Sequence, residues 1–297
     1  MRARATTSPL PSAATALTDV EPMSMPTVTS PTAGHYCAHE RLPIMKVSGA
    51  SVLVTGASSG IGAALAPMLA EQGARVGIVA RRKDRLEEVL ARTQQHDQDA
   101  RMWAVDLGDL DAAVAMVKEA DEFFGGLDVL VNNAGIPKRR DVRVLTNDEI
   151  DETMRVNYTA PVRMSLALLP GMLERGRGCI VNVTSLAGRL GVKHETAYTA
   201  SKFALTGFTE AMAIDLWDTP VEIRLVLPGA IDTEIWDLPG NDDPVYDGPK
   251  EPPETVAGGI IAAIEGTAFE HYLPDMKGVA EWKTSSIDEF LGGVAAL

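Results

Sequence analysis

The stretch Ser51-Val-Leu-Val-Thr-Gly-Ala-Ser-Ser-Gly-Ile-Gly62 joins a short β-branched run to a glycine-rich turn. An Ala- and Leu-rich segment follows as far as Gln72, and Gly73 comes directly after it. The β-branched run predicts a strand, and the segment after the turn predicts a helix that ends at the glycine. The sequence therefore predicts a strand–turn–helix unit at the start of an α/β domain.

The same alternation continues along the chain. Further strands are predicted at 74–80, 100–105, 128–131, 179–184, 222–227 and 269–273, and helices at 83–96, 109–124, 148–174, 200–217 and 253–265. Strands that alternate with crossover helices form a parallel sheet, and near-continuous apolar strands indicate burial on both faces. We predict a single Rossmann-type, three-layer α/β domain with a seven-stranded, mainly parallel sheet and helices on both faces.

The chain divides into three parts by composition. Residues 1–46 are rich in Ser, Thr, Ala and Pro without periodicity, which predicts a disordered extension. Met45 offers an alternative start downstream of it, and Arg2 and Arg4 give only a faint likeness to a transit peptide. Residues 47–275 are predicted to form the domain, including a lid at 232–254, and 276–297 a tail with a short helix.

Charge and cysteine content narrow the function classes. The net charge of −14 argues against nucleic-acid binding, and no apolar run approaches the length of a membrane span. Cys179 lies in an apolar run that predicts a buried thiol, so no disulfide framework is expected and a cytoplasmic location is predicted. His35, Cys37 and His39 are metal-ligand types, but we interpret them as a chance cluster and predict no metal.

The glycine turn has the placement that a dinucleotide site requires. Glycines there permit a tight turn and backbone approach to a pyrophosphate, and the helix N-terminus attracts the anion. The next strand ends in Ala80-Arg81-Arg82-Lys83, with no acid before Asp84. An acid at this point hydrogen-bonds the ribose of NAD, whereas arginine accommodates the extra phosphate of NADP. We predict NADP(H) in preference to NAD(H).

The spacing Gly56-x-x-x-Gly60-x-Gly62 resembles the short-chain dehydrogenase/reductase family in its compact form, over roughly residues 47–275. The resemblance implies that Asp106 contacts the adenine ring and that Asn132-Asn133-Ala134-Gly135 steadies the sheet beside the cofactor. The residues predicted to bind the cofactor are Gly56, Ser58, Ser59, Gly60, Ile61, Gly62, Arg81, Arg82, Asp106, Leu107, Asn133, Ala134, Gly135, Tyr198, Lys202, Pro228, Gly229, Ile231 and Thr233.

Tyr198 and Lys202 are four residues apart, so on a helix they share one face. A nearby ammonium stabilises a phenolate and lowers the pKa of the phenol, which allows acid–base catalysis. The pair alone is compatible with an ordinary surface contact. The resemblance adds Ser185 as the group that holds the substrate oxygen and Asn157 as the group that positions a water beside the lysine.

These residues imply hydride transfer between nicotinamide and a carbonyl or secondary alcohol, with Tyr198 as proton donor. Three alternatives remain open: a non-catalytic cofactor-binding or scaffold protein on this fold, the same chemistry with NAD, and an epimerase or dehydratase. The four intact residues Asn157, Ser185, Tyr198 and Lys202 argue against the first. The compact glycine spacing disfavours the last.

The sequence says less about the residues that would bind the substrate. The basic run 138–143 could attract an anion, but a solvated loop is the favoured interpretation. Residues 232–254 hold eight acids against one lysine, and the two charged segments could pair across the pocket mouth. Apolar lid residues could supply the pocket wall: Ile235, Trp236, Leu238 and Tyr246. The resemblance further implies a homodimer or homotetramer formed through helices 148–174 and 200–217.

Overall fold

The computed structural model describes residues 44–296. The predictions for 1–46, including the metal-ligand types at His35, Cys37 and His39, therefore lie almost wholly outside the described residues. The strands are β1 (Ser51–Thr55), β2 (Arg75–Ala80), β3 (Arg101–Ala104), β4 (Val129–Asn132), β5 (Gly178–Val183), β6 (Val221–Pro228) and β7 (Glu270–Leu273). The α-helices are α1 (Gly60–Glu71), α2 (Lys83–Thr93), α3 (Leu110–Phe124), α4 (Asn147–Met154), α5 (Ala160–Arg175), α6 (Thr196–Asp215), α7 (Pro253–Ile264), α8 (Lys277–Ser285) and α9 (Ile287–Ala296).

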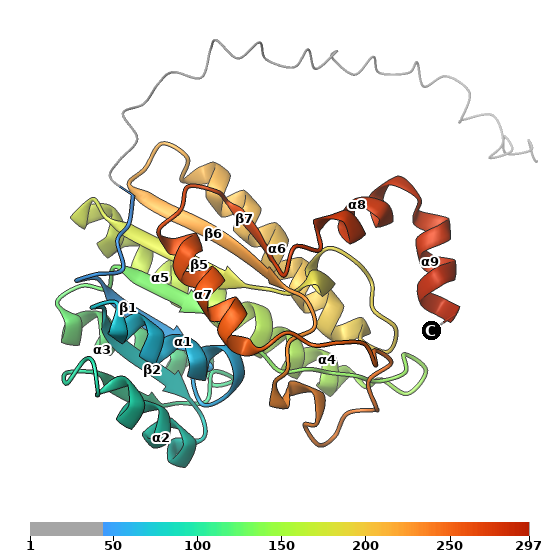
Figure 1. The fold of residues 1–297 in the computed structure, drawn as a ribbon, viewed down its shortest axis with the longest axis horizontal. Helices are drawn as coiled ribbons and strands as arrows, with labels where there is room; N and C mark the ends of the chain where they lie inside the picture. Colours follow the sequence, from blue (N-terminus) through green and yellow to red (C-terminus); the bar gives the residue numbers. More distant parts are fainter. Residues whose placement is uncertain (1–43, 297) are drawn as a thin grey trace, which may run out of the picture. The chain divides into compact units, whose positions relative to one another are not determined.

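The strands of the described residues form one seven-stranded sheet in the order β3-β2-β1-β4-β5-β6-β7, with every neighbouring pair parallel (Figure 1). The central strands are fully buried because both faces of the sheet are covered. This confirms the predicted fold class.

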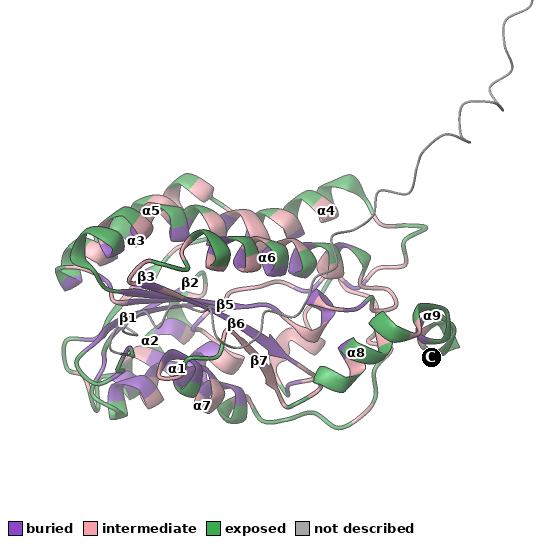
Figure 2. Ribbon diagram, turned by 90° about the horizontal axis from the view of Figure 1, so that it is seen from above, coloured by how far each residue is buried: buried purple, intermediate pink, exposed green. Residues whose placement is uncertain are grey.

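Two apolar cores, one on each face of the sheet, pack the sheet against its two helix layers. Figure 2 places α1, α2 and α7 on one face and α3, α4, α5 and α6 on the other. Side chains such as Leu65 and Ile260 fill the first core, and Leu130 and Met164 fill the second. The strand order reverses between β1 and β4, and ligands of open α/β sheets bind outside the carboxyl ends of the strands at such a point.

The predicted long helix over 148–174 is interrupted. Between α4 and α5 the residues Arg155–Thr159 form a π-helical turn. Pro161 follows it and has no amide hydrogen to donate to the carbonyl of Asn157, so a regular α-helical bond is missing there. A π-turn of this kind carries one extra residue and re-aims the side chains that it contains.

Two other boundaries differ from the predictions. Helix α6 begins at Thr196, four residues before the predicted start, and so it includes Tyr198. The last twenty residues contain two helices, α8 and α9, joined by an edge-to-face contact between Trp282 and Phe290, rather than one short helix. Among residues 44–296, no helix combines the length and the hydrophobicity needed to cross a membrane.

Candidate active site

The glycine turn packs directly on the segment that follows β4. Gly56 has a φ of +70°, and a Cβ added to it would lie 2.7 Å from the Cα of Ala134. A Cβ added to Gly62 would lie 2.5 Å from the carbonyl oxygen of Gly56. Both positions therefore require glycine, for backbone conformation in the first case and for close approach of helix α1 in the second.

The Asn-Asn-Ala-Gly segment is tied to β1 by Thr55. The Thr55 hydroxyl accepts hydrogen bonds from the amides of Asn133 (3.0 Å) and Ala134 (3.1 Å), and the Asn133 side chain donates to the Thr55 carbonyl (2.9 Å). Asn132 is buried and donates to Asn182 on β5 (2.8 Å). This segment therefore links three neighbouring strands at the switch point.

A cleft of about 260 Å³ runs along this edge of the sheet. The predicted cofactor residues that line it are Gly56, Ser58, Ser59, Gly60, Ile61, Arg81, Arg82, Asp106, Leu107, Asn133, Ala134, Gly135 and Thr233. Gly62 does not line it and lies beneath the turn. Glycine backbone, serine hydroxyls and arginines on one wall fit a dinucleotide with its phosphates, so the residues present match the implied cofactor.

The two predicted phosphate-binding arginines differ in surroundings. Arg82 donates hydrogen bonds to the hydroxyls of Ser59 (2.8 Å) and Ser58 (3.2 Å), so its guanidinium lies against the glycine turn. Arg81 extends the other way, with its guanidinium 3.8 Å from the Asp106 carboxylate. Arg82 is consequently the arginine that the fold holds closest to the phosphate-binding backbone.

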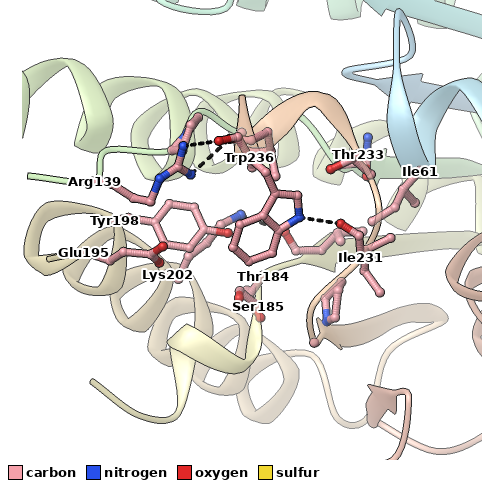
Figure 3. A pocket seen from close by; sticks show the side chains of 17 residues that line it. Ile61, Arg139, Thr184, Ser185, Glu195, Tyr198, Lys202, Ile231, Thr233 and Trp236 are labelled. Carbon is pink, nitrogen blue, oxygen red and sulfur yellow. Dashed lines mark hydrogen bonds between the residues drawn. The ribbon is translucent and has the colours of Figure 1, made fainter. Parts of the chain in front are cut away.

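A second pocket of about 140 Å³ continues from the cleft and contains three of the four predicted catalytic side chains, Ser185, Tyr198 and Lys202 (Figure 3). Ser185 follows β5, while Tyr198 and Lys202 share one face of α6. Pro228, Gly229, Ile231 and Thr233 from the end of β6 also line this pocket. Since Ile61, Asn133, Gly135 and Thr233 line both hollows, a bound nicotinamide could reach the tyrosine.

The acid–base properties of the pair differ from the sequence prediction. Burial, reinforced by the Glu195 carboxylate, raises the pKa of Tyr198, while a hydrogen bond with Ser185 acts against this. Burial lowers the pKa of Lys202 to about 8. The direction is opposite to the predicted lowering of the tyrosine pKa, because desolvation by burial is the largest influence on the phenol. Tyr198 keeps its proton at neutral pH.

Lys202 and Asn157 meet at Gly135, behind the pocket. The Lys202 ammonium donates to the Val183 carbonyl (3.2 Å) and lies 5.6 Å from the centre of the Tyr198 ring. Asn157 is fully buried in the π-turn, where its amide group bridges the main chain of Ile136 (2.8 and 2.9 Å). The π-turn thus brings Asn157 and the lysine to the same glycine, although Asn157 does not itself line the pocket.

The lid is anchored by a buried arginine from the basic run. Arg139 is 3% exposed, and its guanidinium donates to the carbonyls of Trp236 (2.6 Å), Asp242 (3.0 Å) and Ile235 (3.1 Å), as Figure 3 shows in part. Trp236 forms part of the pocket wall and also donates from its indole to the Ile231 carbonyl (2.6 Å). The solvated-loop interpretation of the basic run is wrong at this residue.

The rest of the basic run pairs with acids. Arg140 contacts Glu149 (3.0 Å) and the lid residue Asp242 (2.8 Å). One ion pair, Arg140 with Asp242, therefore joins the two charged segments and offsets part of the positive charge of the basic run. Of the apolar lid residues, Ile235 and Trp236 line the catalytic pocket, Leu238 lines the cofactor cleft, and Tyr246 packs on Trp236 instead.

Glu195 is a pocket residue that sequence reasoning missed. It precedes α6 and lines the pocket beside Tyr198 (Figure 3). Burial raises the pKa of its carboxyl to about 7, with Arg139 acting in the opposite direction. The sequence could have identified Glu195 as a neighbour of the tyrosine, because it lies three residues before Tyr198 and residues at that spacing lie on adjacent parts of one helix face.

Comparison with known proteins identifies the family. The family model described as short chain dehydrogenase matches residues 50–242. The chain belongs to the short-chain dehydrogenase/reductase family. Members of this family are oxidoreductases, and this chain is one of them.

Two curated relatives illustrate the range of similarity. A dehydrogenase/reductase SDR family protein 7-like of Anopheles gambiae is 36% identical over 196 residues, which cover 64% of this chain and 61% of that protein. A 3-oxoacyl-[acyl-carrier-protein] reductase of Vibrio harveyi is 34% identical, with 64% of this chain and 77% of the relative covered.

Solved structures agree in fold. A short-chain dehydrogenase from Burkholderia cenocepacia in complex with NADP superposes with a TM-score of 0.71 at 28% identity, covering 84% of this chain and 99% of that one. A short-chain dehydrogenase from Sphingobium yanoikuyae in complex with NADPH gives 0.70 at 27% identity, covering 83% and 95%. The fold and the nicotinamide-binding family are therefore shared.

Proposed function

We propose that this protein is an NADP-dependent reductase of small carbonyl compounds that acts through Ser185, Tyr198, Lys202 and Asn157. The observation that carries the proposal is the placement of Tyr198 in one pocket with Ser185 and Lys202, where the cofactor cleft opens into that pocket. A tyrosine that carries its proton can act as the general acid in carbonyl reduction.

The nicotinamide supplies the hydride when it is bound. Ser185 donates a hydrogen bond that orients the carbonyl oxygen of the substrate, and Tyr198 transfers its phenolic proton to that oxygen as negative charge develops on it. Lys202 holds the cofactor ribose and stabilises the phenolate left on Tyr198, while Asn157 supports the lysine side of the proton path. Trp236 and Ile235 exclude water from the pocket.

The preference for NADP rests on Arg82. Its guanidinium is already oriented by Ser58 and Ser59, so little side-chain freedom is lost when it pairs with a phosphate. Arg81 lies on the same side of the cleft and adds positive charge. The complexes of similar structures with NADP and NADPH support the same choice.

The deciding experiment is a titration of the purified protein with NADPH and NADH, followed by a screen of ketones and aldehydes for oxidation of the bound cofactor. Tighter binding of NADPH and turnover of at least one carbonyl compound are expected. Binding of neither cofactor would overturn the proposal. Tighter binding of NADH would overturn the cofactor assignment alone.

Glu195 predicts a specific pH dependence of stability. Its folded-state pKa of about 7 exceeds the ordinary value of 4.5, so between these values the folded chain holds a proton that the unfolded chain has released. The free energy of unfolding therefore falls as pH rises through this window. Glu195→Gln removes the effect and should raise Tm by about 2–5 °C at pH 8 but leave it unchanged near about pH 4, below both pKa values. Thermal unfolding at both pH values checks this; an equal shift at both would contradict it.

We also propose that a second copy of the chain covers α5 and α6. Large apolar side chains stand exposed there: Leu166 and Leu173 on α5, Ile214 near the end of α6 and Trp217 just after it, the last two 73% exposed. An isolated apolar side chain is ordinary, but a group on adjacent helices is typical of an interface. Sedimentation equilibrium should give a dimer or tetramer mass, and a monomer at micromolar concentration would contradict the proposal.

A further inference from the structure

The lid places a carboxylate on Arg82, one of the two predicted phosphate-binding arginines. Glu234 begins the short 3₁₀ helix Glu234–Trp236, far along the chain from α2. Its carboxylate contacts the guanidinium of Arg82 at 2.8 Å and also that of Arg85. Glu234 lines the cofactor cleft together with Arg82 and the two serines of the glycine turn. One anion of the chain therefore already occupies the cationic end of the cleft.

The bonding of Arg82 shows what this carboxylate does there. The Nε and Nη2 groups of Arg82 face the serine hydroxyls, while its Nη1 group faces Glu234. A phosphate beside Ser58 and Ser59 would need the same guanidinium. Carboxylate and phosphate cannot share it without like-charge repulsion. The side chains of Glu234 and Arg82 are 41% and 38% exposed, and ion pairs so exposed are weak enough to be displaced.

We propose that Glu234 competes with the 2′-phosphate of NADP for Arg82 and Arg85, and so weakens the binding of NADP while leaving that of NAD unchanged. The inference rests on the proposed function, because it takes the cleft to be the cofactor site.

The variant that tests this is Glu234→Gln, which keeps the shape and removes the charge. It should lower the Kd of NADPH about three- to tenfold and leave the Kd of NADH within about twofold. Raising NaCl from about 50 to about 500 mM should shrink the gain, since screening weakens the competing ion pair. Quenching of tryptophan fluorescence or calorimetry on the full chain measures both constants without any substrate.

The matched control is Asp243→Asn, which removes one negative charge from the same lid at an exposed residue with no arginine contact among the described residues. It should leave both constants unchanged. In the background of Arg82→Ala, the gain from Glu234→Gln should largely disappear, because the contested guanidinium is gone.

Three results would overturn the inference. These are an unchanged Kd for NADPH in Glu234→Gln, an equal gain for NADPH and NADH, and weaker NADPH binding, which would mean that Glu234 positions Arg82 for the phosphate. Failure of the wild-type chain to bind either cofactor is a separate outcome: it overturns the proposed function itself and the inference with it. Thermal unfolding of each variant identifies any change caused by misfolding.

Discussion

Replacing Tyr198 with Phe is expected to lower kcat by about 10³-fold while leaving the Kd of NADPH within about threefold of wild type. The substitution removes one oxygen and keeps the ring, so the packing at the start of α6 is preserved. It removes the only proposed proton donor to the substrate oxygen, which Ser185 can orient but cannot protonate as readily. Steady-state kinetics with the best carbonyl substrate, together with cofactor titration, measure the two effects separately.

The control for this variant is Tyr272→Phe on β7. The Tyr272 hydroxyl contacts Glu270 (3.3 Å) and lies outside both the cofactor cleft and the catalytic pocket. Its removal should leave kcat within about twofold, as expected of a substitution away from the chemistry. Retention of more than about a tenth of wild-type turnover by Tyr198→Phe would remove the tyrosine from its proposed role.

Replacing Arg139 with Met is expected to have the second largest effect, through the lid. Methionine fills a similar volume but leaves the carbonyls of Ile235, Trp236 and Asp242 without their donor. Each buried acceptor that loses its partner costs about 1–3 kcal/mol, so the lid should leave its closed position for much of the time. We expect kcat/KM for the carbonyl substrate to fall at least about tenfold, mainly through KM, because the wall at Trp236 is no longer fixed.

A second measurement needs no substrate. Lys250 lies in the lid, and trypsin should cleave after it faster in Arg139→Met than in wild type, because the opened lid exposes its backbone. Arg143→Met is the matched control: Arg143 belongs to the same basic run but its side chain is 84% exposed and pairs with Asp141. Identical kinetics and cleavage rates in the two variants would show that the Arg139 contacts do not hold the lid.

The fold was predictable from the sequence because its signals are local. The β-branched runs, the glycine turn at 56–62 and the alternation with amphipathic helices each depend on near neighbours in the chain. Parallel pairing and the switch point then follow from the topology of crossover connections. The one substantial error, a continuous helix over 148–174, arose because a π-turn leaves no mark on apolar periodicity.

The residues of the candidate site could be predicted only where they belong to a sequence motif with a characteristic spacing. Tyr198, Lys202, Ser185 and the glycines were found in this way, and the structure gathers them at one edge of the sheet. The places of Arg139, Glu195 and Glu234 could not be predicted, since each depends on a partner between 56 and 152 residues away in the chain. The pKa of Tyr198 was misjudged for a related reason: desolvation depends on everything packed around a group, and no spacing records it.

Two backbone hydrogen bonds join the ends of the lid, and they affect how far the length of this loop can change. The backbone of Asp232 donates to Glu251 (2.8 Å), and that of Glu251 donates to Ala230 (2.9 Å), so both feet of the loop are joined before it leaves the domain. With its ends fixed, the entropy of closing such a loop grows only slowly with length. The segment between those feet can therefore change in length or sequence without disturbing β6 or α6.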